Sequence, residues 1–349
     1  MAPTRLGIMG LGRIGRNLLR LLYHAEDLRI VAVCDIADLE ALAYLIKFDT
    51  LLGRFPEEVA LRDDNLFVAG RQIRMLQAEK PGDADWAALG VEVVIEATSR
   101  YRTRAELEKH LQAGAQRVIL CAPPVDPPDI TVVPGINAEE VRPEHRILSN
   151  GSCTAHAAGP LVKLLREEFG IRRSFLSTVH AYTSQQRLAD VPTEDKRRGR
   201  AAAENIIPQD TNAADMLAEL IPALAGKITG KALNVPVPNG SAVDLVCWHE
   251  RPVSVVAINE AVRNAVANRW RDFYAYENEP IVSSDILRSP ASGTFDSQAT
   301  MVIGTQLSKT LAWYDNSWGY AHRAIDLVRR LARFGPPPAA AAPPTGASR

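Results

Sequence analysis

Cys153 and His180 are the two residues of this sequence best suited to covalent catalysis. Cys153 lies in the polar run SNGSCT (residues 149–154), and His180 follows 27 positions later in TVHAYT (residues 178–183). A helix is predicted to begin just after Cys153, and a helix N-terminus and a nearby imidazolium both favour the thiolate near neutral pH. A thiol nucleophile beside a base is suited to the covalent capture of an aldehyde or an acyl group.

Each residue taken alone has a simpler interpretation. A single cysteine is usually a small buried hydrophobic residue, and this is how we interpret Cys34, Cys121 and Cys247. A histidine in an apolar stretch, such as His180, is usually part of a core. The prediction of catalysis therefore depends on the two residues together, with a polar loop placed directly before Cys153.

A glycine-rich turn near the N-terminus predicts a dinucleotide site. The run GLGRIG (residues 10–15) follows a short apolar strand and opens a helical pattern over residues 14–23. Its glycines permit a tight turn and let backbone N–H groups approach a pyrophosphate. Asp35 ends the next strand, 20 residues after the last glycine, where a carboxylate binds the adenosine ribose hydroxyls. Because no arginine follows Asp35 to accept a 2′-phosphate, NAD is preferred over NADP.

The two halves of the chain have different strand patterns. Before residue 150, short apolar strands alternate with helices, which predicts a parallel sheet covered on both faces. After residue 150 the strand candidates 175–182, 232–248 and 299–314 are longer and partly alternating, as in antiparallel sheets. Helices are predicted over residues 154–169, 211–225, 254–268 and 318–334. Pro160 is expected to bend the first of these or to cost it a hydrogen bond.

Composition limits the class of protein. The chain has 349 residues, enough for two domains, and its net charge of −1 gives no reason to expect nucleic acid or a membrane surface as a partner. The four cysteines have neither metal-ligand nor disulfide spacing, which suits a reducing cytoplasm. No signal segment or apolar run of transmembrane length is present. The Pro- and Ala-rich tail, residues 335–349, is predicted to be disordered.

With these motifs in place, residues 4–334 resemble the glyceraldehyde-3-phosphate dehydrogenase family. The resemblance is carried by SNGSCT, by HAYT at 180–183 and by WYDN at 313–316. It implies an α/β Rossmann-type NAD-binding domain with a parallel sheet (residues 1–150) and an α+β catalytic domain with a mostly antiparallel sheet (residues 151–315). It also implies a C-terminal helix, residues 316–334, that returns to the first domain, and a homotetramer.

The resemblance also implies roles for individual residues. Cys153 would attack an aldehyde to give a thiohemiacetal, His180 would act as base, and inorganic phosphate would cleave the resulting thioester to an acyl phosphate. The implied cofactor-binding residues are Gly10, Gly12, Arg13, Ile14, Gly15, Asp35, Lys80, Cys121 and Asn316. The implied substrate- and phosphate-binding residues are Ser152, Thr154, Thr183, Arg198, Thr211, Asn212 and Asn234. The Arg- and Lys-rich segment 181–206 resembles the S-shaped loop of the family, although a solvated charge run has the same composition.

Departures from the family pattern leave the substrate open. Asn234 stands where the family usually has the arginine that binds the phosphate of the substrate, and losing that contact would cost about 1.5–3 kcal/mol. Either Arg187 or Arg200 compensates, or the preferred aldehyde differs. Asn212 and Ser99 each replace a glycine of the family.

Three functions follow from these observations. The first is NAD-dependent phosphorylating oxidation of glyceraldehyde 3-phosphate. The second is the same chemistry on erythrose 4-phosphate or an unphosphorylated aldehyde, which Asn234 suggests. The third is a non-catalytic relative that serves as a binding protein, against which the intact pair of Cys153 and His180 argues.

Overall fold

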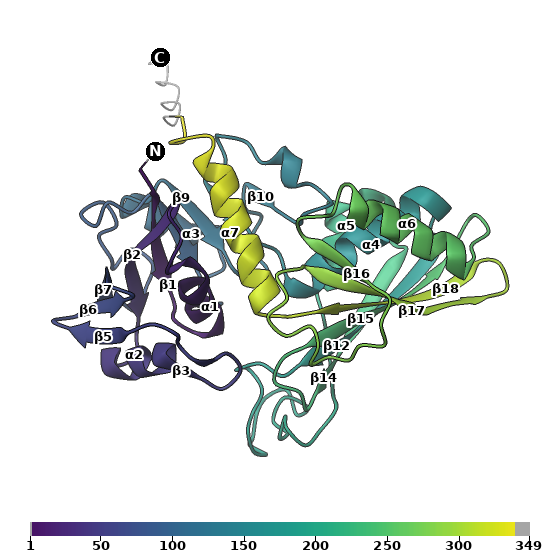
Figure 1. Ribbon diagram of the computed structural model, residues 1–349, viewed down its shortest axis with the longest axis horizontal. Coiled ribbons are helices and arrows are strands. Elements are labelled where there is room, and N and C mark those ends of the chain that lie inside the picture. The colour runs from purple at the N-terminus through teal and green to yellow at the C-terminus, as the bar shows by residue number, and fades with distance from the viewer. Residues whose placement is uncertain (1, 339–349) are drawn as a thin grey trace, which may run out of the picture.

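Two sheets with a long helix between them form the framework of the protein (Figure 1). The computed structural model describes residues 2–338. Most of the predicted tail, residues 339–349, lies outside the described residues. Seven adjacent strands of the first sheet are parallel to one another, and the second sheet is mostly antiparallel, so the predicted fold class is confirmed.

The first sheet has the strand order β10-β11-β9-β8-β1-β2-β7-β6-β5. Its strands are β1 (Thr4–Met9), β2 (Leu28–Asp35), β5 (Val59–Arg62), β6 (Asn65–Val68), β7 (Arg71–Gln77), β8 (Val93–Glu96), β9 (Arg117–Leu120), β10 (Ile130–Thr131) and β11 (Ile147–Ser149). Along the chain, three helices connect these strands: α1 (Arg13–Leu22), α2 (Leu39–Lys47) and α3 (Arg104–Gln112). The connections also contain the 3-10 helix η1 (Ala138–Glu140) and a two-stranded ribbon of β3 (Phe48–Asp49) and β4 (Gly53–Arg54). Since β1 pairs with β2 on one side and β8 on the other, the sheet has the reversal of strand order beside which dinucleotides bind.

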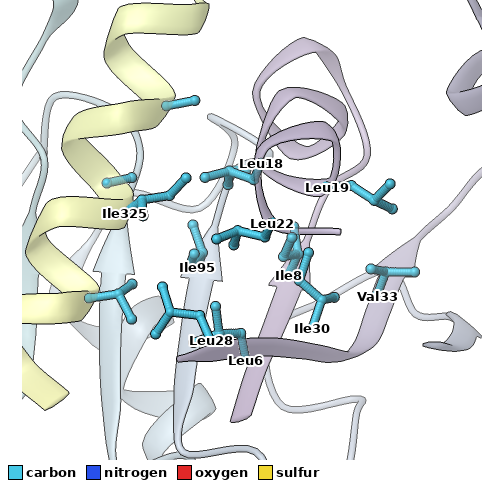
Figure 2. Close-up of a cluster of buried hydrophobic side chains, with 14 of the residues drawn as sticks. Leu6, Ile8, Leu18, Leu19, Leu22, Leu28, Ile30, Val33, Ile95 and Ile325 are labelled. Carbon is cyan, nitrogen blue, oxygen red and sulfur yellow. The ribbon is translucent and has the colours of Figure 1, made fainter. Parts of the chain in front are cut away.

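The core of this half is completed by the last helix of the chain, α7 (Trp318–Ala332). Leu6 and Ile8 of β1 pack with Leu18 and Leu22 of α1, and Ile325 of α7 reaches the same cluster (Figure 2). These side chains are almost fully buried. Burial of each such apolar side chain contributes roughly 1.5–3 kcal/mol relative to leaving it exposed. The C-terminal helix is therefore an integral part of the core of the first sheet.

The second sheet has the order β13-β14-β12-β15-β18-β17-β16. Its strands are β12 (Arg173–Ala181), β13 (Ile207–Gln209), β14 (Ile228–Val235), β15 (Ser241–Trp248), β16 (Tyr274–Glu277), β17 (Gly293–Ile303) and β18 (Leu307–Tyr314). The helices α4 (Cys153–Phe169), α5 (Ala213–Leu220) and α6 (Val255–Ala267) pack against it, and the 3-10 helix η2 (Pro222–Leu224) follows α5. Segment 182–206, between β12 and β13, forms no helix or strand beyond a single bridge.

Two predicted strands are wrong in length. The candidate 232–248 is divided into β14 and β15 by a turn that contains Pro238, Asn239 and Gly240, and the candidate 299–314 is divided into β17 and β18 by a turn at Gly304. Both turns contain a glycine with positive φ, where a side chain would be strained. Turn residues therefore outweigh the apolar pattern on either side of them. In contrast, α4 continues through Pro160 as one helix of 17 residues.

No helix within residues 2–338 is long and apolar enough to cross a bilayer.

The first turn of α1 requires glycine at Gly15 for a steric reason, because this residue packs against the turn that follows β1. A Cβ atom at Gly15 would lie 2.0 Å from the carbonyl oxygen of Gly10, whereas a Cβ at Gly12 would meet no atom within 4 Å. Gly10 itself has φ +94°, a conformation that residues with side chains rarely adopt.

We expect Gly15→Ala to destabilise the protein, because the new methyl group forces the turn apart. The expected loss is roughly 1–3 kcal/mol in the free energy of unfolding, the usual cost of overpacking. Urea denaturation of the unliganded protein measures it. Gly12→Ala is the matched control and should leave the unfolding midpoint unchanged; equal losses in both variants would contradict the steric explanation.

Candidate active site

A cavity of about 460 Å³ lies where the two sheets meet, and it brings together residues from distant parts of the sequence. Cys153, His180 and Asn316 line it together with the glycine-rich turn. The remaining lining includes Thr98, Arg100, Arg102, Cys121, Ser152, Thr183 and Tyr320. The two residues predicted to react therefore face the same space as the predicted cofactor turn.

Cys153 is the first residue of α4, as its position after a polar loop predicted. The Ser152 hydroxyl caps this helix by accepting a hydrogen bond from the backbone N–H of Ala155, at 3.1 Å. The cap leaves the first backbone N–H groups of α4 near the thiol, and such groups favour negative charge. The Cys153 side chain is partly buried.

His180 is held by its own strand. Its Nδ1 lies 2.6 Å from the carbonyl oxygen of Ala181, and its Nε2 lies 3.6 Å from the Cys153 sulfur. Because a carbonyl only accepts, Nδ1 carries the proton of the neutral ring and Nε2 is left as an acceptor facing the thiol. The geometry is that of a nucleophile beside a base whose tautomer is set by a backbone contact.

Burial opposes the charged form of both partners. It raises the pKa of the Cys153 thiol, while the backbone N–H and the hydroxyl of Thr154 and the backbone N–H of Cys153 lower it. Burial likewise lowers the pKa of His180, although its contact with Ala181 raises it, and the positive charge of Arg13 lowers it further. The hydrogen-bond donors at the start of α4 therefore act against burial to favour the Cys153 thiolate, and His180 lies beside the thiol to receive its proton.

A second cavity of about 250 Å³ continues from the first along the glycine-rich turn. Gly10, Gly12, Asp35 and Cys34 line it, and Gly12 faces both cavities. Asp35 accepts hydrogen bonds from the backbone N–H groups of Leu11 (2.7 Å) and Ala37 (3.0 Å), which orient its carboxylate.

Open space beside the Gly12 Cα, and an oriented carboxylate at the end of β2, fit a dinucleotide that spans the two cavities. The pyrophosphate would lie at the turn and the adenosine ribose at Asp35.

The structure brings most of the predicted cofactor residues to these cavities. Gly12, Arg13, Ile14, Cys121 and Asn316 line the first cavity, and the Asn316 side chain is oriented by a hydrogen bond from the Ser241 hydroxyl to its Oδ1 (3.1 Å). Gly15 is buried in the first turn of α1, where it acts through packing against Gly10. Lys80 is exposed and lines neither cavity; its backbone N–H donates to Asp83.

The predicted phosphate-binding residues are less closely grouped. Ser152 and Thr183 line the first cavity, and the Thr183 hydroxyl donates to Gln186 at 2.8 Å. Thr154 is buried, with its hydroxyl 2.9 Å from that of Tyr314.

The other four lie outside the cavity lining. Arg198 is paired with Asp195 (3.3 Å) at the surface, and Thr211 accepts from the N–H of Ala213. Asn212 caps α5 without a side-chain hydrogen bond. Asn234 is buried on β14 beside His180, and its amide donates to the Ala181 carbonyl at 3.4 Å. Their phosphate-binding roles stay predictions.

Several residues of the cavity were not singled out from the sequence. Arg100 and Arg102 add positive charge to the wall that Arg13 also lines, and Tyr320 of α7 contributes an aromatic surface. Arg187 and Arg200, considered as replacements for a missing arginine, lie elsewhere; Arg200 is paired with Asp190 at 3.0 Å. Arg100 and Arg102 follow the end of β8, and ligands of parallel sheets bind beyond such ends. Their place directly after a predicted parallel strand is the feature of the sequence that indicates Arg100 and Arg102 as ligand-binding residues.

Within residues 2–338 no group of three His, Cys, Asp or Glu side chains is arranged to hold a metal ion.

Comparison with known proteins matches both halves of the chain. Residues 4–104 match the family model described as glyceraldehyde 3-phosphate dehydrogenase, NAD binding domain, and residues 152–316 match the C-terminal domain of the same family. A glyceraldehyde-3-phosphate dehydrogenase of Geobacillus stearothermophilus is 43% identical over 333 residues, covering 95% of this chain and 99% of the relative. One of Streptomyces coelicolor is 46% identical over 327 residues, covering 93% and 97%.

We expect His180→Asn to raise the pH at which Cys153 becomes reactive. The thiolate loses the imidazolium beside it, and removal of an opposite charge at this range shifts a pKa by roughly 1–3 units. The rate of alkylation by iodoacetamide as a function of pH measures the midpoint.

His156→Asn is the control for this experiment. His156 lies three residues after Cys153 in α4, and burial lowers its pKa to about 3, so it carries no charge at the assay pH. Its replacement should leave the midpoint unchanged. If His180→Asn also left it unchanged, the two groups would not be coupled.

Proposed function

The chain belongs to the glyceraldehyde-3-phosphate dehydrogenase family, and we propose on this premise that it oxidises glyceraldehyde 3-phosphate with NAD and inorganic phosphate to an acyl phosphate. The observation that carries the proposal is the distance of 3.6 Å between the Cys153 sulfur and Nε2 of His180, in a cavity that the glycine-rich turn also lines. The enzyme is an NAD-dependent phosphorylating dehydrogenase.

In the first step the Cys153 sulfur adds to the aldehyde carbon and forms a thiohemiacetal. The backbone N–H groups at the start of α4 are placed to stabilise the oxygen that becomes negative. Nε2 of His180 takes the proton of the Cys153 thiol and passes it to this oxygen, which gives the hydroxyl of the thiohemiacetal. The same Nε2, free again, then accepts that hydroxyl proton as the carbon loses a hydride, while the Ala181 carbonyl holds the opposite side of the ring. NAD supplies a hydride acceptor when it is bound, and its binding residues would be the glycine-rich turn, Asp35 and Asn316.

The oxidised adduct is a thioester on Cys153. A thioester keeps the acyl group reactive, so phosphate can attack the carbonyl carbon and displace the thiolate. Ser152 and Thr183 line the cavity around Cys153 and would bind phosphate oxygens there. Arg13, Arg100 and Arg102 make this cavity attractive to anions. These roles, together with those of Thr154, Arg198, Thr211, Asn212 and Asn234, belong to the proposal.

The proposal extends to a homotetramer. The helices α4, α5 and α6 pack on one face of the second sheet, whereas Phe175, Trp248 and Ile303 on the other face are 62%, 49% and 69% exposed. The register places Trp248 opposite Leu307, and Leu307 opposite Ile303, so these side chains share one face. Lys309 and Asp244, which form an ion pair at 3.0 Å, lie on the same face, and an exposed face of apolar and charged side chains suits contact with a second copy of the chain.

The division into domains is also our proposal, with boundaries at residues 150 and 315 and the C-terminal helix packed on the first domain. The burial of α7 side chains in the core of the first sheet supports it.

A cytoplasmic location is proposed because all four cysteines are free thiols, which a reducing compartment maintains. Cell fractionation tests this location.

We expect NADH to form rapidly from NAD and glyceraldehyde 3-phosphate only when inorganic phosphate is present. Absorbance of NADH in the presence and absence of phosphate measures this dependence, because the thioester of Cys153 accumulates without an acceptor. Erythrose 4-phosphate and unphosphorylated glyceraldehyde are the comparison substrates. Higher kcat/KM on either would contradict the proposed substrate and identify Asn234 as a determinant of a different one. No turnover on any aldehyde would contradict the enzyme proposal.

We expect sedimentation to give four times the chain mass of 38.1 kDa. Phe175→Asp should shift the protein to smaller species, because it places a charge on the apolar face of the second sheet. Val256→Asp, at a site on α6 that is 65% exposed, is the matched control and should keep the mass of the unaltered protein. A monomer before any substitution would contradict the proposed assembly.

A further inference from the structure

Glu96, the last residue of β8, is a fully buried carboxylate that takes no part in the chemistry described above. One of its oxygens, Oε1, accepts hydrogen bonds from the backbone N–H of Thr98 (2.8 Å) and from the Thr98 hydroxyl. The other, Oε2, lies 3.2 Å from Nε2 of His110. Burial of an acidic side chain is costly unless such donors surround it, so these three contacts need an explanation.

The donor character of His110 is set by a third buried residue. The indole N–H of Trp86 lies 3.1 Å from Nδ1 of His110, and an indole N–H only donates. Nδ1 is therefore the acceptor and Nε2 carries the proton that is donated to Glu96. Trp86 and His110 are both fully buried, and Trp86 packs against Gly7 of β1. A chain of hydrogen bonds thus connects the core of the first sheet to Thr98, with Glu96 accepting from His110 on one side and from Thr98 on the other.

Thr98 lies in the wall between the two cavities that we assign to the cofactor. Ala97, Thr98 and Arg100 line both of them. The Thr98 hydroxyl also accepts from the backbone N–H of Arg100 at 3.1 Å, which extends the chain along the wall. Between them, Ser99 has φ +59°, a conformation that costs a residue with a side chain about 1 kcal/mol relative to glycine.

We propose that Glu96 is a positioning residue for the cofactor. Through Thr98 it holds segment 97–100 in the conformation that forms the wall between the two cavities. The inference rests on the proposed function, since it assigns the two cavities to NAD. His110 orients Glu96, and Trp86 fixes the tautomer of His110. The three contacts to Glu96 thereby maintain the unfavourable conformation of Ser99 in the absence of any ligand.

Glu96→Gln tests the proposal, because an amide has the size of the carboxylate but replaces one acceptor oxygen by a donor. The Kd for NAD, measured by titration of the unliganded enzyme, should rise by about tenfold or more. The alkylation rate of Cys153 without NAD should not change, since Glu96 contacts no residue of the pair. At saturating NAD, kcat should stay within about twofold. A merely structural role would change these quantities together.

Glu108→Gln is the matched control, since it removes a half-exposed carboxylate, paired with Arg104, from α3 two residues before His110. It should leave the Kd for NAD unchanged. NAD binding by the unaltered protein is measured first; if it is absent, the proposed function fails and the role of Glu96 fails with it. A folded Glu96→Gln variant that binds NAD normally would overturn the positioning role alone.

A second variant covers the case in which Glu96→Gln does not fold. His110 lines neither cavity, so His110→Gln alters the hydrogen bond to Glu96 on the side away from Thr98. The expected results are a higher Kd for NAD and faster amide hydrogen exchange at Thr98 and Arg100. Protected amides with an unchanged Kd would overturn the proposal.

Discussion

The buried carboxylate of Asp315 joins the parts of the chain on which the site depends. Its Oδ1 accepts from the backbone N–H groups of Ser317 and Trp318 and from the Ser317 hydroxyl, at 2.7 to 3.1 Å. Its Oδ2 accepts from the Asn239 amide and from the backbone N–H of Arg288, both at 2.9 Å. These contacts fix the end of β18, the start of α7 and the turn between β14 and β15 relative to one another. Asn316, next in the chain, is thereby directed into the cavity.

How far the sequence predicts the fold depends on how local each signal is. The glycine-rich turn and Asp35 lie within one strand–helix–strand unit, and their geometry follows from residue types alone. Cys153 at the start of α4 is equally local. The predicted strand 232–248 fails because apolar residues continue on both sides of the turn at Gly240, and only the turn residues reveal the break.

Long-range pairings account for what the sequence does not predict about the site. The phosphate-binding role of Thr154 stays a prediction, but the contact of its hydroxyl with that of Tyr314, 160 residues away, does not follow from its place after Cys153. Arg100 is recognisable only once β8 is known to end beside the glycine-rich turn. The buried contact of Glu96 with His110 likewise needs α3 to be packed on the sheet. Such partners follow from tertiary packing, which no pattern of a single segment encodes.

The position of α7 in the core of the first sheet has a consequence for the order in which the chain is made. A ribosome releases the N-terminal strands first, and domains generally begin to fold as soon as they emerge. Here Tyr320, Ile325 and Leu331 complete that first core, although they are among the last residues to be synthesised. The core of the nascent N-terminal half therefore stays incomplete until the rest of the protein has emerged from the ribosome. Until α7 has been made, the growing chain therefore exposes apolar side chains that the complete protein buries.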